Sequence, residues 1–273
     1  MASADIQHIL DDKPFADTIV IKDIQKLQEE HAHSGNAYWV IAADGKRYKL
    51  RACNNVDLAM RIERTIARVQ HIFPKLYGRD RQYLLMEALE GYRRLTEEDL
   101  LKNLHAIGRI YGEVHQLQDA GNHDHRTFYH ARLFYLKTEG LIDDELYQKL
   151  REKFEHTIAN IEYRISMDYN DLHAGNMMQG PKGDILFVDE EGLAYRVKGL
   201  GLAKLLKTLK HDDQYKEFMK GYTEVTDGAY LTPEYLEHIR LVEIVQALAN
   251  KRLKKTYPEA ILREVEMLKK LVA

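Results

Sequence analysis

Residues 168–190 read DYNDLHAGNMMQGPKGDILFVDE, and this stretch is the most informative part of the chain. Asp171 is followed by Asn176 five positions later and by Asp189 at the end of the apolar run 185–188. Mg²⁺ prefers oxygen ligands, usually one or two carboxylates together with substrate phosphates. Phosphoryl transfer also needs a group that orients the attacking hydroxyl and accepts its proton. An Asp, an Asn and a strand-borne Asp in this order meet both requirements.

The same order occurs in protein kinases, whose catalytic loop carries an Asp and an Asn before a strand-borne metal-binding Asp. DLHAGNMM followed by FVDEE resembles the H-G-D-L-H-x-G-N and I-D-x-E motifs of the aminoglycoside phosphotransferase and choline kinase-like family. The resemblance implies that Asp171 is the catalytic base, that Asn176 and Asp189 hold Mg²⁺, and that His173 and Gly175 shape the loop. The alternative is a polar loop before an ordinary buried strand. It explains less well why Asp171, the L-H-x-G-N sequence and the strand-borne Asp189 occur together.

The chain departs from the family pattern at two positions. Tyr169 stands where the first histidine of the motif is expected, and in the family that histidine supports the loop without acting as the base. Residues 197–203 read VKGLGLA and correspond to a segment that ends in D-L-A, so Gly201 replaces an aspartate that helps to anchor the loop. Activity can survive the first replacement, whereas the second bears on the geometry of the substrate side.

Composition predicts a compact protein of the cytoplasm. Among 273 residues the charges nearly cancel, with a net charge of −3, so no basic excess points to nucleic acid. The single cysteine, Cys53, excludes an intrachain disulfide and reads as a small buried hydrophobe. Residues 1–12 lack the pattern of a secretory signal, and no apolar run approaches the roughly 18 residues of a membrane span. We therefore expect no membrane partner, and the oligomeric state stays open.

Hydrophobic periodicity predicts a β-rich first third followed by helices, and the resemblance implies that these form an α+β, bilobal, protein kinase-like fold. A small β-rich N-lobe, residues 1–88, would contain an antiparallel sheet and one helix and bind the nucleotide. A larger helical C-lobe, residues 89–273, would hold the catalytic loop and the substrate site. The elements expected in the N-lobe are strands at 18–21, 37–42, 47–53 and 83–86, a hairpin turn at Asp44-Gly45, and a helix at 56–70. In the C-lobe we expect a helix after Thr96, one or two helices over 131–165 interrupted at Gly140, and several more after Gly199.

Two short segments are the expected nucleotide contacts of the N-lobe. Ser34 and Gly35 lie where the family has its glycine-containing loop, and small residues there allow backbone N–H groups to approach phosphate oxygens. A plain β-turn is the alternative for this segment. Glu87 and Ala88 resemble the hinge, where backbone amides would read the adenine.

Cations on the strand at 47–53 are the expected phosphate contacts. Arg51 ends a Y-x-L-R pattern whose last cation binds nucleotide phosphates in the family, and its planar fork suits bidentate contact. Lys49 lies on the same strand face and is the rival candidate. Glu63 on the following helix is expected to pair with Arg51, as the corresponding glutamate does in kinases. Alternatively, Glu63 forms a surface ion pair with its neighbours Arg61 and Arg64.

The function expected from these residues is transfer of the γ-phosphate of ATP to a hydroxyl of a small molecule, assisted by Mg²⁺. GTP stays open as the donor. An aminoglycoside-resistance kinase is one alternative, although the segment 119–165 mixes acidic and basic residues where a polycation would need acids. A protein kinase is less favoured, since little chain follows Asp189 before the next helical region and no A-P-E occurs. A non-catalytic module of kinase-like fold is the third alternative.

Overall fold

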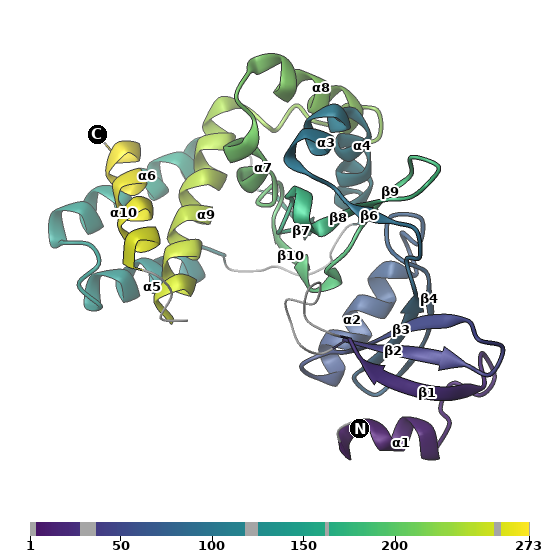
Figure 1. Ribbon diagram of the computed structural model, residues 1–273. Coiled ribbons are helices and arrows are strands. Elements are labelled where there is room, and N and C mark those ends of the chain that lie inside the picture. The colour runs from purple at the N-terminus through teal and green to yellow at the C-terminus, as the bar shows by residue number, and fades with distance from the viewer. Residues whose placement is uncertain (1–3, 28–36, 118–124, 162–163, 254–257, 273) are drawn as a thin grey trace. The chain divides into compact units, whose positions relative to one another are not determined.

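The structure is a computed structural model that describes residues 4–27, 37–117, 125–161, 164–253 and 258–272 (Figure 1). The chain divides into two compact units. The first, here the N-terminal unit, consists of Met1–Thr96 with Ala174–Leu193. The second, the helical unit, consists of Glu97–His173 with Ala194–Ala273. The fold is mixed, with a sheet in one unit and mainly helices in the other, as the sequence predicts.

The division differs from the single boundary expected after residue 88. The N-terminal unit extends to Thr96 and also takes in Ala174–Leu193. The physical reason is a long-range strand pairing, because β6 (Arg93–Arg94) pairs antiparallel with β8 (Met177–Gln179), which in turn pairs with β9 (Ile185–Phe187).

The main sheet of the N-terminal unit has five antiparallel strands in the order β1-β2-β3-β5-β4. Gly45 has a φ of 84° in the turn between the second and third strands, which confirms the hairpin expected at Asp44-Gly45. The strands are β1 (Ile21–Lys26), β2 (Ala37–Ala42), β3 (Arg47–Ala52), β4 (Leu76–Asp80) and β5 (Tyr83–Glu87).

Two of these strands differ from expectation. β1 begins at Ile21, where the strand expected at 18–21 would end. β4, which contains Gly78, is absent from the expected strands. β4 is an edge strand whose register with β5 shifts between Leu76 and Gly78, and edges and bulges are the places where a strand tolerates glycine.

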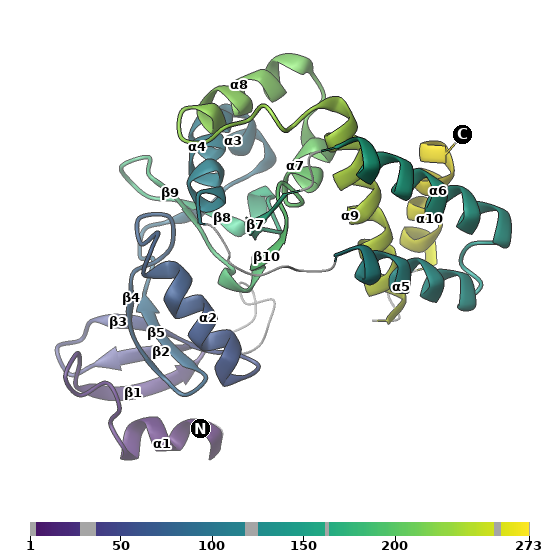
Figure 2. The ribbon, with the colours of Figure 1, turned by 180° about the vertical axis from the view of Figure 1, so that it is seen from behind.

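Both faces of the main sheet are covered by a helix (Figures 1 and 2). α1 (Ala4–Asp11) places Ile6 and Ile9 in a core with Leu50 and Leu85, which point to one face. α2 (Val56–Ile66) lies on the other side and is capped by Asn55, whose side chain accepts the Leu58 N–H. Because side chains alternate along β3, Lys49 and Arg51 face away from the α1 side of the sheet.

The helical unit begins with a close pair of helices, α4 (Leu104–His115) and α8 (Asp212–Thr223). A Cβ built on Gly108 would lie 2.0 Å from Phe218 O, and one on Gly221 would lie 1.9 Å from His105 O. Glycine is therefore required at both positions to let the two backbones approach. Short α3 (Glu97–Lys102) precedes this pair, and the interruption at Asn103 divides the helix that was expected after Thr96.

Four helices form a second core in the helical unit, and they group together in Figure 2. Gly140, with a φ of 69°, separates the first two of them as expected. They are α5 (His125–Thr138), α6 (Asp144–Asn160), α9 (Pro233–Leu253) and α10 (Pro258–Val272). α7 (Leu202–Thr208) follows a two-stranded sheet of β7 (Ile165–Tyr169) and β10 (Leu193–Val197). None of the described helices is long and apolar enough to cross a membrane.

A buried histidine in this core makes the stability of the helical unit depend on pH. His238 of α9 lies with Nδ1 3.0 Å from Thr157 Oγ1, and burial lowers its pKa to about 4. Its unfolded form binds a proton near pH 6.5, so its contribution to stability is lost as the pH falls from about 6.5 to 4. Between pH 7 and pH 5 we expect His238 to account for a loss of about 2 kcal/mol in the free energy of unfolding.

The measurement is urea unfolding followed by far-ultraviolet circular dichroism at the two pH values. His238→Gln should flatten the pH dependence, whereas His156→Gln, at an exposed position of α6, should leave it unchanged. An unaltered pH dependence in His238→Gln would show that the buried imidazole is not responsible.

Candidate active site

A hairpin in the N-terminal unit brings the two expected metal ligands to one end. In the register of β8 and β9, Met177 lies opposite Phe187, and the Val188 N–H donates to Asn176 O at 2.9 Å. Asn176 and Asp189 therefore lie at the same end of this hairpin, one before β8 and the other after β9.

Asp189 has an unusual backbone conformation. Its φ of 70° and ψ of 63° place it in the left-handed region, which a residue other than glycine seldom occupies. Aspartate tolerates this region better than most residues do, and such strained positions are concentrated at functional sites. The Asp189 side chain is 44% exposed, whereas that of Glu190, the next residue, is fully buried.

Arg51 of β3 binds all three acids that follow β9. Its Nη2 lies 3.1 Å from Asp189 Oδ1 and 2.9 Å from Glu191 Oε1, and Nη1 is bonded to Glu190 Oε2. Burial acts to lower the pKa of Arg51, but the neighbouring carboxylates, with Glu190 first, outweigh it and raise the pKa. The guanidinium is thus a permanent charge that holds the acidic segment against the sheet.

The expected pairing of Arg51 with Glu63 is not what the structure shows. Glu63 Oε2 accepts a hydrogen bond of 2.6 Å from Arg79 Nε of β4, a partner that neither alternative foresaw. The physical reason is burial, because Glu190 has no access to water and needs a positive charge more than the partly exposed Glu63 does.

The positive charge of Lys49 also stabilises the buried Glu190 carboxylate. Burial raises the pKa of Glu190, yet the charges of Lys49 and Arg51 outweigh it, so the pKa lies below its usual range. Glu190 Oε1 is buried and has no hydrogen-bond partner among the residues that the structure describes. The two cations of β3 therefore face the same acidic segment, as the shared strand face predicts.

The donor set at the hairpin end fits Mg²⁺. Asn176 and Asp189 offer an amide and a carboxylate oxygen, the hard ligands that this ion prefers. Within the described part of the chain, no three His, Cys, Asp or Glu side chains gather as a metal site. Two protein ligands suit an ion that is held jointly by substrate phosphates and water, and they do not suit a closed structural zinc site.

In the helical unit, Asp171 lies in the loop that follows β7 and is bound by two cationic or polar groups. Lys204 Nζ, from α7, forms an ion pair with Asp171 Oδ1, and His173 Nε2 lies 3.5 Å from Oδ2. Burial acts to raise the pKa of Asp171, but hydrogen bonds from His173 and Lys204 outweigh it and lower the pKa. The carboxylate is therefore ionised and oriented, with its side chain 28% exposed.

The remaining candidates have different outcomes. Ser34 and Gly35 lie outside the described residues. At the expected hinge, the Glu87 N–H donates to Lys75 O at 2.8 Å, and Ala88 follows the end of β5. Cys53 is buried as expected, and burial raises the pKa of its thiol to about 11, so it is not a reactive thiolate.

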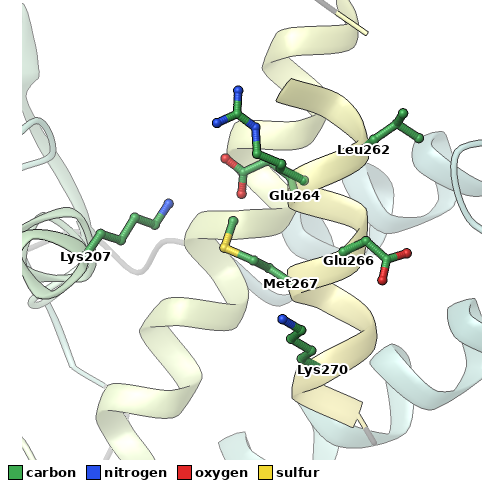
Figure 3. Close-up of a pocket in the computed structure, with 7 residues that line it drawn as sticks. Lys207, Leu262, Glu264, Glu266, Met267 and Lys270 are labelled. Carbon is green, nitrogen blue, oxygen red and sulfur yellow. The ribbon is translucent and has the colours of Figure 1, made fainter. Parts of the chain in front are cut away.

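A pocket of about 610 Å³ lies in the helical unit between α7 and α10. Figure 3 shows Lys207 reaching from α7 toward Met267 and Lys270 of α10. The lining carries both signs of charge, with three basic and two acidic side chains, so it offers no acidic surface for a polycation. Its residues are Lys207, Leu262, Arg263, Glu264, Glu266, Met267 and Lys270.

Sequence reasoning missed two members of the site. Lys204 is one of many lysines on predicted helices. It lies 33 positions from Asp171 in the sequence, so no local pattern indicates that the two side chains form an ion pair. Glu190 has no role in the motif comparison, although it is fully buried and anchors that segment to Arg51. A run of three acids directly after an apolar strand was the available signal.

Comparisons of sequence find no relative, since no family model matches and no curated protein matches the chain. Comparisons of structure find similar proteins. Choline kinase LicA from Streptococcus pneumoniae, also solved with AMP, aligns with a TM-score of 0.68 at 14% identity over 98% of this chain and 99% of that one.

Two antibiotic phosphotransferases align over a similar extent. Macrolide 2'-phosphotransferase MphH from Brachybacterium faecium has a TM-score of 0.65 at 12% identity, covering 98% of this chain and 97% of its own. ADP-bound aminoglycoside phosphotransferase APH(2'')-Ib has a TM-score of 0.63 at 14% identity, covering 99% and 98%. The chain thus has the kinase-like fold shared by choline kinases and antibiotic phosphotransferases.

Proposed function

We propose that the protein is a kinase that transfers the γ-phosphoryl group of ATP to a hydroxyl of a small molecule. The observation that carries the proposal is the set of three oxygen-bearing side chains in residues 168–190 on this fold. Asn176 and Asp189 lie together at one hairpin end, and Asp171 is held as an oriented anion in the preceding loop.

Asp171 is assigned to the acceptor hydroxyl. It would orient this group and take its proton while the new O–P bond forms and the bond from the γ-phosphorus to the bridging oxygen of ATP breaks. Transfer passes through a loose transition state, so positioning and charge stabilisation carry most of the catalysis. A carboxylate with a low pKa is a weak base, and holding the hydroxyl in line is therefore its main task.

The N-terminal unit is assigned to the nucleotide. Asn176 and Asp189 would hold Mg²⁺, which when bound neutralises charge on the β- and γ-phosphate oxygens. Arg51 orients the acidic segment and would steady the phosphates beside it, with Lys49 as the rival for that contact. Since the Glu87 N–H is already bonded to Lys75, we assign the adenine contact to the Ala88 backbone. AMP in a LicA complex supports an adenine nucleotide.

A small-molecule acceptor is favoured over a protein. Only η2 (Glu190–Gly192), β10 and the turn at 198–201 separate Asp189 from α7, which leaves no segment of the length that docks a peptide in protein kinases.

Replacement of Asp171 tests the assigned base. Asp171→Asn keeps the shape of the side chain but removes the proton acceptor, so kcat should fall by about 10²- to 10⁴-fold. Binding of ATP with Mg²⁺, measured by calorimetry, should change little. Turnover is to be followed as ATP consumption over a panel of amino alcohols, sugars, nucleosides, aminoglycosides and macrolides.

The matched control is Asp212→Asn, at an exposed position in the first turn of α8, which should retain wild-type turnover. If Asp171→Asn retained wild-type turnover, the base assignment would be wrong. Binding of ATP without turnover of any acceptor by the wild type would instead favour a non-catalytic module.

Replacement of Asp189 tests the metal site. Asp189→Asn should raise the Mg²⁺ concentration for half-maximal turnover by at least about tenfold, because the ion loses a charged oxygen ligand. Glu191→Gln is the control, since Glu191 also binds Arg51, at 2.9 Å, but is not an assigned ligand. Equal shifts in the two variants would show that loss of an Arg51 partner, and not of a metal ligand, causes the effect.

A further inference from the structure

Tyr169 and Gly201, the two positions at which the chain departs from the family pattern, are in contact within the helical unit. A Cβ built on Gly201 would lie 2.0 Å from the carbonyl oxygen of Tyr169 and 2.9 Å from Asp168 Oδ1. Real Cβ atoms do not approach backbone atoms so closely. The aspartate that the resemblance leads one to expect at position 201 therefore has no room on this backbone.

Asp168 already occupies the space beside Gly201 with a carboxylate. It is fully buried at the end of β7, three residues before Asp171. Its Oδ2 accepts the Gly199 N–H at 2.6 Å and its Oδ1 accepts the Gly201 N–H at 3.1 Å. Asp168 thus binds the backbone immediately before α7 directly.

Two side chains of α4 complete the bonding of Asp168. The Tyr111 hydroxyl donates to the carboxylate at 3.1 Å and accepts the Leu202 N–H at 3.1 Å. His115 Nε2 lies 3.2 Å from Asp168 Oδ2, and His115 Nδ1 lies 2.7 Å from the Tyr222 hydroxyl. A carboxylate only accepts, so Nε2 carries the proton and Nδ1 accepts from Tyr222.

The charge in this network belongs to Asp168. Burial raises the pKa of the carboxyl, but the hydrogen bond from His115 leads the effects that outweigh it and lower the pKa. Burial lowers the pKa of His115, so the imidazole is neutral. A buried anion that accepts from two backbone N–H groups, a hydroxyl and an imidazole fixes their relative positions strongly.

We propose that Asp168, with His115, is the positioning anchor of the catalytic loop and takes over the role of the family histidine and aspartate missing at Tyr169 and Gly201. Asp168 holds the start of α7 through Gly199 and Gly201, and α7 carries the Lys204 that binds Asp171. The anchor therefore acts on the base through Lys204. This inference rests on the proposed function for its catalytic consequence, but the anchoring itself does not depend on it.

Asp168→Asn tests the anchor with two separate readouts. Amide hydrogen exchange should accelerate locally, over the catalytic loop at 170–175 and the start of α7 at 199–204, because the anionic acceptor is lost. With the acceptor identified in the panel, kcat should fall by about 10- to 100-fold while the KM for ATP stays within about twofold.

Thr157→Val is the matched control, because it removes a buried side-chain hydrogen bond, that of Thr157 with His238, elsewhere in the helical unit. It should leave kcat and loop exchange unchanged. Two milder variants guard against a folding defect. His115→Gln keeps an N–H donor and should retain most of kcat, whereas His115→Leu should lower it.

The proposal is overturned if exchange in Asp168→Asn rises evenly across the helical unit, or if kcat stays within twofold of the wild type. Equal activity of His115→Gln and His115→Leu would also contradict it. Absence of turnover by the wild type on every acceptor would count against the proposed function, and the exchange pattern would then decide on the anchor by itself.

Discussion

The ion pair between Arg51 and the buried Glu190 is the interaction on which the acidic segment after β9 depends. Glu190 is fully buried, so its charge requires a partner, and Arg51 supplies one from the middle of the main sheet. Removing one member of a buried pair destabilises a protein by roughly 3–5 kcal/mol. Because Glu190 directly follows Asp189, this pair also fixes a residue whose backbone is in the left-handed region. A buried ion pair thus holds the partly exposed carboxylate of Asp189, the proposed metal ligand.

The helical unit repeats this arrangement with different chemistry. Asp168 is buried and satisfied by backbone N–H groups and by α4, while the nearby Asp171 remains partly exposed. In each unit a buried acid thus lies close in sequence to a partly exposed acid to which we assign a functional role. The separation of roles is physically reasonable, since a fully desolvated carboxylate is costly to move and a partly solvated one can exchange its partners.

Local patterns explain which features could be predicted from the sequence. The turn at Asp44-Gly45, the helix after Asn55 and the motif from Asp171 to Asp189 each depend on residues close in the chain, and the first two are present in the structure as expected. The features that were missed depend on distant residues. The pairing of β6 with β8, the partner of Glu63 and the ion pair of Lys204 are decided by packing, for which neither spacing nor periodicity carries a signal.

The relation between positions 168 and 201 shows why a motif can change while a fold persists. A Cβ at position 201 would meet the carbonyl oxygen of Tyr169 at 2.0 Å as well as Asp168 Oδ1 at 2.9 Å, so only glycine allows this approach of the two backbones. An aspartate at 201 would require the backbone of residue 169 to move, and replacing Asp168 alone would not make room for it. A comparison that scores each position separately counts Tyr169 and Gly201 as two departures from the motif, although in this chain the Asp168 carboxylate holds the backbone before α7.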